Sequence, residues 1–101
     1  SKKRKREIED IPKADIEKLY GLKPKKFKMI DDETNEVHYG LIAEEVDQIM
    51  PECCVYEPDG SPSTVQYHKF TGPLLYVSQD HAKRIAQLEA EIDSLKKSLE
   101  K

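Results

Sequence analysis

The sequence predicts an α+β fold in which small antiparallel β-hairpins and short helices precede one long C-terminal helix. Three observations lead to this prediction: two pairs of short alternating segments around polar turns, two stretches with helical spacing of apolar residues, and no glycine or proline after Pro73. Alternation is typical of half-buried strands, whereas apolar residues three and four apart indicate amphipathic helices. We therefore expect an α+β body over residues 1–70 and a coiled-coil helix for self-association over residues 71–101.

The composition favours a small domain that associates with other copies. The 101 residues are 37% hydrophobic and 37% charged, and a chain of this size buries only about two-thirds of its unfolded surface. Small cores are often supplemented by oligomerisation. Residues 2–6 hold five of the 17 basic residues, which leaves 12 against 20 acidic residues, a net charge of −8, in the rest of the chain. Such an acidic body disfavours a nucleic-acid surface spread over the domain.

No cofactor, metal or membrane partner is expected. The sequence contains no apolar run long enough for a membrane span, no signal peptide and no glycine-rich phosphate loop. Cys53 and Cys54 are the two cysteines, and neighbouring cysteines cannot close a relaxed disulfide bond. No second pair is present for a disulfide framework or a zinc site, so we expect reduced thiols.

The first half of the body is predicted to contain one helix and one hairpin. Residues 7–11 resemble a short strand or an extended lead-in, and Pro12 suits a first helical position. Apolar residues then share one helix face until Gly21 ends the helix: Ile16, Leu19 and Tyr20. Two short alternating runs follow around a polar turn at residues 31–36, which indicates a β-hairpin: Phe27 and Met29, then Val37 and Tyr39.

The second half of the body is predicted to contain another helix and another hairpin. From Leu41 the apolar residues take helical spacing until Pro51 ends the element: Ile42, Val46, Ile49 and Met50. A hairpin is then expected from residues 53–57 and 64–67, around the turn-rich sequence of residues 58–62.

The last third is predicted to be one helix that forms a parallel coiled coil. Gly72 and Pro73 open it, and apolar residues then step by three and four as a heptad seam: Ile85, Leu88, Ile92, Leu95 and Leu99. In this register, the g and following e positions pair opposite charges, Arg84 with Glu89 and Glu91 with Lys96. Complementary g–e′ charges favour parallel self-association. Ile at a with Leu at d favours two strands, but Leu99 at an a position and His81 at a d position depart from that rule, so the seam leaves the number of helices open. The alternative is a lone amphipathic helix packed on the body, for which the seam is narrow.

One ordered set of motifs resembles a known family. The segment His38–Val46, sequence HYGLIAEEV, is followed by Met50-Pro51-Glu52, by Asp59-Gly60, by Val65-Gln66-Tyr67 and by the heptads. This order resembles the C-terminal intramolecular chaperone domain of phage tail spikes, fibres and neck appendages, the endosialidase-type self-cleaving peptidases. The resemblance covers nearly the whole chain.

The resemblance implies a function and two catalytic residues. Members of the family trimerise, assist the folding of the upstream region of the same polypeptide, and cut themselves off just before a serine. Ser1 and Arg4 match the family pattern, while Lys2 replaces its usual Asp and Arg6 occupies the usual Lys spacing. With a one-residue deletion counted back from Ile8, Lys5 takes the place of the catalytic lysine. The resemblance therefore implies that Ser1 is the nucleophile, that Lys5 is the base, and that the chain is the released product.

The chemistry agrees with these roles. A serine hydroxyl becomes a good nucleophile only when a base takes its proton. A lysine acts as that base when its pKa falls from about 10.4 toward neutrality, and nearby like charges favour its neutral form. Residues 2–6 crowd five cations together, and three parallel chains would bring three such clusters close to one another. We therefore expect trimerisation to switch cleavage on.

Two other functions stay open on the sequence alone. One is a trimerisation module that has lost cleavage, and the other is the related processing domain of a membrane-tethered transcription factor. Taken alone, residues 2–6 also resemble a nuclear-localisation or nucleic-acid-binding tail. His38 is at most a supporting residue of the catalytic site. The preferred expectation is a homotrimer that binds neither nucleic acid nor membrane, working in the host cytoplasm during virion assembly, with the upstream product in the virion tail.

Overall fold

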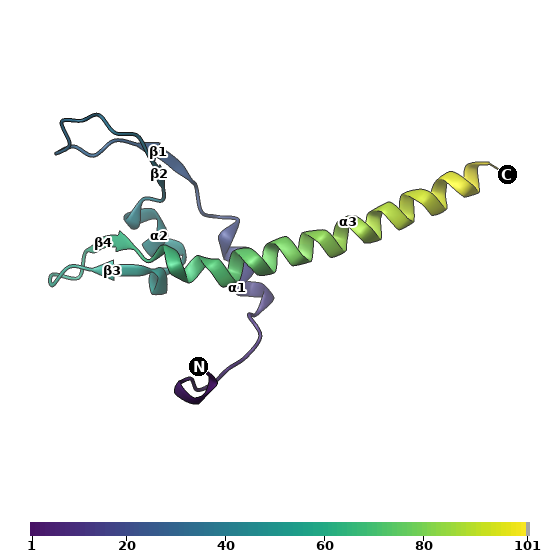
Figure 1. The fold of residues 1–101 in the computed structure, drawn as a ribbon, viewed down its shortest axis with the longest axis horizontal. Helices are drawn as coiled ribbons and strands as arrows, with labels where there is room; N and C mark the ends of the chain where they lie inside the picture. The colour runs from purple at the N-terminus through teal and green to yellow at the C-terminus, as the bar shows by residue number, and fades with distance from the viewer. Residues whose placement is uncertain (101) are drawn as a thin grey trace. The chain divides into compact units, whose positions relative to one another are not determined.

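The computed structural model describes residues 1–100 and divides into two units, Ser1–Lys69 and a second from Phe70 onward. The first unit contains two separate two-stranded antiparallel sheets and short helices, and the second is dominated by one long helix (Figure 1). The predicted α+β class, with two small hairpins and a long C-terminal helix, is confirmed.

The chain enters the first unit through a single turn of 3-10 helix, η1 (Lys2–Arg4). Residues 7–12 form no regular secondary structure, so this segment is a lead-in and contains no strand. Helix α1 (Lys13–Leu19) follows, and Pro12 is its N-cap instead of its first residue because its ψ of 143° is extended. Ile16 is the buried residue of α1.

The first hairpin pairs strands β1 (Lys25–Phe27) and β2 (His38–Gly40), with Phe27 opposite His38. The predicted hairpin is confirmed, but its strands are shorter than the alternating pattern indicated. Residues 28–37 form a long connecting loop, which extends away from the strands in Figure 1.

Helix α2 (Ala43–Ile49) supplies Ala43 and Val46 to the core of this unit. Val46 is only 1% exposed, and the other buried residues of the unit come from α1, α2 and the segment after it: Ile16, Ala43, Met50, Cys53 and Cys54. The predicted helix is confirmed. Pro51 follows it and begins the short 3-10 helix η2 (Pro51–Cys53), as expected of a residue that cannot continue the α-helical hydrogen bonds.

The second hairpin pairs β3 (Cys54–Tyr56) with β4 (Pro62–Val65), and α2 packs against it. Its register places Cys54 opposite Val65, with an irregularity after Val55. Gly60 in the turn has a φ of +89°, which favours glycine. The predicted hairpin is confirmed, although the second strand ends two residues before Tyr67.

Both cysteines are free and buried. The Cys54 thiol lies 3.5 Å from the carbonyl oxygen of Ala43, to which it donates a weak hydrogen bond. Burial raises the pKa of both thiols, with smaller contributions from nearby acidic groups such as Glu52 and Asp47. These residues therefore act as small apolar side chains of the core.

The 3-10 helix η3 (Tyr67–Phe70) precedes α3 (Thr71–Leu99), a helix of 29 residues. Its predicted seam is exposed along its whole length, with exposed fractions of 52% at Ile92 to 85% at Leu99. Ion pairs within the helix join Arg84 to Asp80 at 3.4 Å and Lys97 to Asp93 at 3.1 Å. Among the described residues, no helix is both long and apolar enough to cross a membrane.

Candidate functional site

Ser1 is held at the start of η1 by two hydrogen bonds from backbone N–H groups. Its hydroxyl oxygen accepts from the N–H of Lys3 at 3.2 Å, and its carbonyl oxygen accepts from the N–H of Arg4 at 3.1 Å. The hydroxyl therefore caps the turn as an acceptor, which leaves its own proton free to be donated to a base.

Lys5 lies one residue beyond this turn, in extended backbone with φ −115° and ψ 147°. Its N–H donates to the carbonyl oxygen of Lys2 at 3.3 Å. The contacts described for this segment include no hydrogen bond between the Ser1 hydroxyl and the Lys5 amine.

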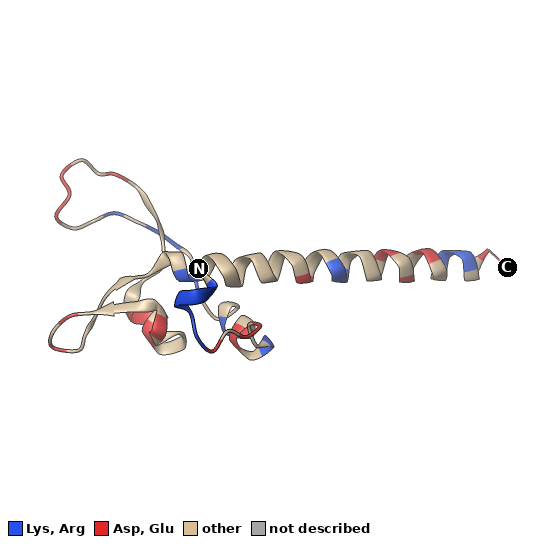
Figure 2. Cartoon of the chain, turned by 60° about the horizontal axis from the view of Figure 1, so that its bottom comes forward, with Lys and Arg blue, Asp and Glu red and all other residues tan. Residues whose placement is uncertain are grey.

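The basic run is exposed throughout. All residues from Ser1 to Asp10 are exposed, and the Lys and Arg residues form one continuous positively charged segment at the N-terminus (Figure 2). Glu7, directly after this run, has a φ of 55°, an uncommon left-handed conformation for a residue with a side chain. Ser1 and Lys5, the candidate catalytic residues, thus lie on an exposed N-terminal arm, residues 1–10, whose positive charge is concentrated at residues 2–6.

His38 lies in the first hairpin and away from the arm. Its ring stacks on Phe27 with centroids 5.7 Å apart, and its Nε2 lies 3.9 Å from a carboxylate oxygen of Glu36. Within the first unit, this hairpin and η1 are well separated (Figure 1). Within one chain, His38 therefore does not support Ser1 directly.

Two separate pieces of the sequence motif meet around the hydroxyl of Tyr67. The N–H of Leu41 donates to this oxygen at 2.9 Å, and the hydroxyl lies 3.4 Å from the carbonyl oxygen of Leu41. A Cβ atom on Gly40 would lie 2.5 Å from the same oxygen, closer than side chains tolerate. Gly40 is therefore required for this contact, which joins the end of β2 to the segment after β4.

The second hairpin is held by side chains that bind backbone carbonyl groups. Gln66 donates from Nε2 to the carbonyl of Cys54 at 2.9 Å, and Lys69 donates from Nζ to that of Glu52 at 2.7 Å. The Tyr56 hydroxyl donates to Asp47 in α2, and this bond raises the pKa of Tyr56 to about 12. These contacts fix the hairpin against α2 and the chain that follows.

An open groove of about 610 Å³ lies between the two hairpins and the start of α2. Its lining is mainly apolar and comes from three stretches of the first unit: residues 27–31, residues 41–44 and residues 63–65, with Tyr67. Sequence reasoning identified the segments that line this groove but did not predict that they would surround one cavity.

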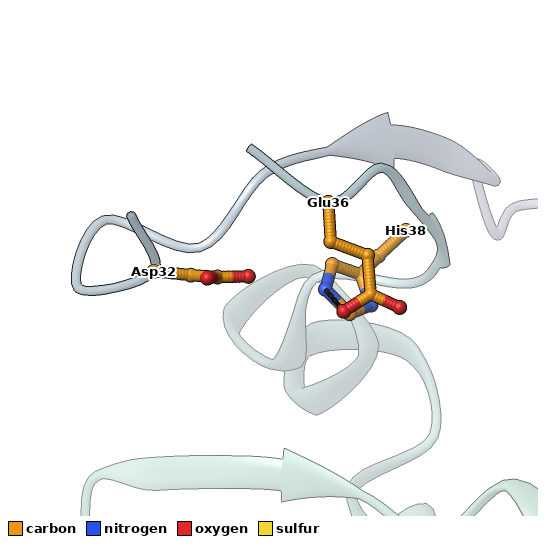
Figure 3. A group of neighbouring side chains, drawn as sticks. All are labelled: Asp32, Glu36 and His38. Atoms are coloured by element: carbon orange, nitrogen blue, oxygen red, sulfur yellow. Dashed lines mark ion pairs between the residues drawn. The ribbon is translucent and has the colours of Figure 1, made fainter. Parts of the chain in front are cut away.

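One cluster of metal-ligand side chains lies in the described residues. Asp32, Glu36 and His38 each offer one ligand atom, and these atoms all lie within 4.8 Å of one another (Figure 3). Sequence reasoning did not single out Asp32 or Glu36. Their spacing along the chain matches no common metal-binding signature. The only signal in the sequence was a polar turn, residues 31–36, shortly before His38.

Comparison with known proteins gives one family. The model of the family described as the chaperone of endosialidase, Peptidase_S74, matches residues 1–54. The match includes Ser1, the basic run, β1, β2 and α2. No curated protein matches the chain.

Proposed function

Because the chain belongs to the chaperone-of-endosialidase family of intramolecular chaperones and self-cleaving peptidases, we propose that it assembles and then releases an upstream region of its own polypeptide. The upstream region would be a phage tail spike, fibre or neck appendage. The chaperone trimerises through α3, assists folding in the host cytoplasm during virion assembly, and is cut from the mature tail protein before Ser1.

The family match over residues 1–54 carries this proposal. It begins at Ser1 and includes Lys5, so both proposed catalytic residues lie within the matched region. It also includes the Gly40–Leu41 segment, whose contact with Tyr67 joins the two hairpins.

The chemistry assigns one role to each residue. The Ser1 oxygen attacks the carbonyl carbon of the residue that would precede it, while Lys5 takes the hydroxyl proton. Lys5 then returns the proton to the leaving nitrogen, which is the backbone nitrogen of Ser1. Water hydrolyses the resulting ester, which frees the Ser1 hydroxyl and leaves a carboxylate on the upstream product. The Lys3 N–H, already bonded to the Ser1 oxygen at 3.2 Å, helps to hold that oxygen in place.

The exposed seam of α3 supports the trimer. Five large apolar residues lie along one helical stripe and are at least 52% exposed: Ile85, Leu88, Ile92, Leu95 and Leu99. Apolar a and d positions are stabilised when two or more helices pack their seams together. In a parallel trimer the helices would start level with one another, and the basic arms would be brought to the same end of the assembly.

The test is to express the domain with its upstream segment and to separate the products on a denaturing gel. We expect wild type to yield two fragments and Ser1→Ala and Lys5→Ala to remain uncut. Lys3→Ala is the matched control, because it removes a neighbouring cation and keeps the Lys3 N–H; it should be cut. Cleavage of Ser1→Ala would exclude Ser1 as the nucleophile. An uncut Arg6→Ala beside a cut Lys5→Ala would show that the one-residue deletion, which places Lys5 at the position of the catalytic lysine, is wrong.

Two alternative functions give different outcomes in the same experiment. A trimerisation module without cleavage would yield one uncut trimeric product from the wild type. The processing domain of a membrane-tethered transcription factor would be cut in the same way but would follow a DNA-binding region in the longer chain. The departures at Lys2 and Arg6 from the family pattern support the first of these alternatives.

A further inference from the structure

Two carboxylates and one imidazole converge beside the first hairpin, away from the proposed catalytic arm. They come from the connecting loop and from the first residue of β2. Figure 3 shows the Asp32 carboxylate directed toward the imidazole of His38, with the Glu36 carboxylate lying across the same ring. Their ligand atoms all lie within 4.8 Å of one another.

Two of the three side chains are held in place by neighbours. One oxygen of Asp32 accepts from the N–H and the hydroxyl of Thr34, at 2.8 Å and 2.6 Å, which leaves its other oxygen available. The His38 ring is stacked on Phe27 at a centroid distance of 5.7 Å, its partner across the hairpin.

The third side chain is free to adjust. The Glu36 side chain is 68% exposed, and one of its oxygens already lies 3.9 Å from Nε2 of His38. Two ligand atoms that share a tetrahedral zinc ion are about 3.3 Å apart, because each lies about 2.0–2.1 Å from the metal. A change in the Glu36 rotamer and a small closure of the loop would bring the three ligand atoms to that spacing.

We propose that Asp32, Glu36 and His38 bind a divalent transition-metal cation of the zinc class, with water completing its coordination. A mixed set of one imidazole and two carboxylates suits Zn²⁺ and neighbouring transition metals, whereas Mg²⁺ and Ca²⁺ are bound by oxygen ligands. The ion would link the loop to β2 and so restrain the long connection of the first hairpin. This site lies outside the proposed peptidase function and does not depend on it.

The test is a zinc titration of the untagged, isotope-labelled protein followed by NMR. We expect the backbone amide signals of residues 31–39 to shift and saturate as Zn²⁺ is added, while Mg²⁺ at the same concentrations leaves them unchanged. His38→Gln removes the imidazole nitrogen and Glu36→Gln removes the carboxylate charge, and each should weaken zinc binding roughly tenfold or more. Glu36 is exposed, so its variant tests the site without disturbing the strand.

His68→Gln is the matched control, since His68 is exposed on η3 and belongs to no described cluster. It should bind zinc as tightly as the wild type. The proposal is overturned if no saturable shift develops at millimolar zinc, if Glu36→Gln and His38→Gln bind as wild type does, or if Mg²⁺ reproduces the shifts. Equal weakening by His68→Gln would also overturn it, because zinc would then be binding to surface histidines in general.

Discussion

The backbone N–H of Leu41 donates a hydrogen bond to the hydroxyl of Tyr67 at 2.9 Å, across 26 positions of the chain. The hydroxyl also faces the carbonyl oxygen of Leu41 at 3.4 Å, so one side chain engages both polar groups of this residue. The neighbouring Gly40 leaves just enough room for the phenol. This contact sets the position of the first hairpin and of the start of α2 relative to the segment that follows the second hairpin.

Gly40→Ala should destabilise the body by about 1–3 kcal/mol. The new Cβ atom would lie 2.5 Å from the Tyr67 oxygen, so the phenol must move and lose its bond to Leu41. In a Tyr67→Phe background the nearest ring carbon is 3.3 Å away, and the same substitution should cost less. Urea unfolding of the four proteins measures the difference, and equal costs in both backgrounds would contradict the steric explanation.

Tyr56 should ionise at a higher pH than an ordinary tyrosine. Its hydrogen bond to Asp47, with burial and the negative charge of Asp47, raises the pKa of Tyr56 from 10.0 to about 12. Because the folded-state pKa is the higher one, this bond stabilises the fold below pH 10 and loses that effect as the pH rises through about 12. Ultraviolet absorbance of the phenolate should show a component that titrates with a pKa of about 12.

Asp47→Asn tests why Tyr56 ionises at high pH, since it removes the negative charge of Asp47 but keeps a side chain of similar shape. The component of the absorbance profile that belongs to Tyr56 should then titrate at a lower pH. Asp59→Asn is the control, because Asp59 binds Ser61 within its own turn and should leave the profile unchanged. If a component that titrates near pH 12 persists in Asp47→Asn, another interaction must raise the pKa of Tyr56.

Cys53 and Cys54 should react slowly with thiol reagents while the protein is folded. Burial raises the pKa of both thiols, and the thiolate is the reactive form. Because their folded-state pKa values are raised, the stability that the neutral thiols contribute is present below their ordinary pKa and is lost as the pH rises through the folded values.

A chromogenic disulfide reagent at mildly alkaline pH measures this protection, and urea should restore a fast reaction. Ser94→Cys provides the control, because position 94 is exposed on α3 and its thiol should react rapidly in the folded protein. Native Cys53 and Cys54 that reacted as fast as this added thiol would contradict the buried arrangement.

Ile92→Lys should prevent self-association through α3. Ile92 lies in the middle of the seam and is 52% exposed in the single chain, and its replacement would bury a lysine from each helix in the proposed interface. An unpaired buried charge costs about 3 kcal/mol or more, so we expect the mass measured by sedimentation equilibrium to fall from trimer to monomer. Gln87→Lys lies outside the seam and should keep the wild-type mass.

Local patterns predicted most of the secondary structure. The heptads of α3, the helix that ends before Pro51 and the two hairpins each follow from residues close together in the chain, because periodicity and turn chemistry are local properties. The strand ends were less predictable. Met29 and Val37 alternate as strand residues do, yet they lie in the loop of the first hairpin, since backbone pairing decides where a strand ends.

For the candidate site, too, some features follow from the sequence and others depend on the tertiary structure. The sequence by itself determined the order of motifs that resembles the family, and with it the choice of Ser1 and Lys5 as catalytic candidates. Only the tertiary structure brought the Tyr67 hydroxyl to Leu41 and converged Asp32, Glu36 and His38 beside one strand. The reason is that contacts between segments depend on how hairpins and helices pack and how loops close, and no periodicity within a single segment records that packing.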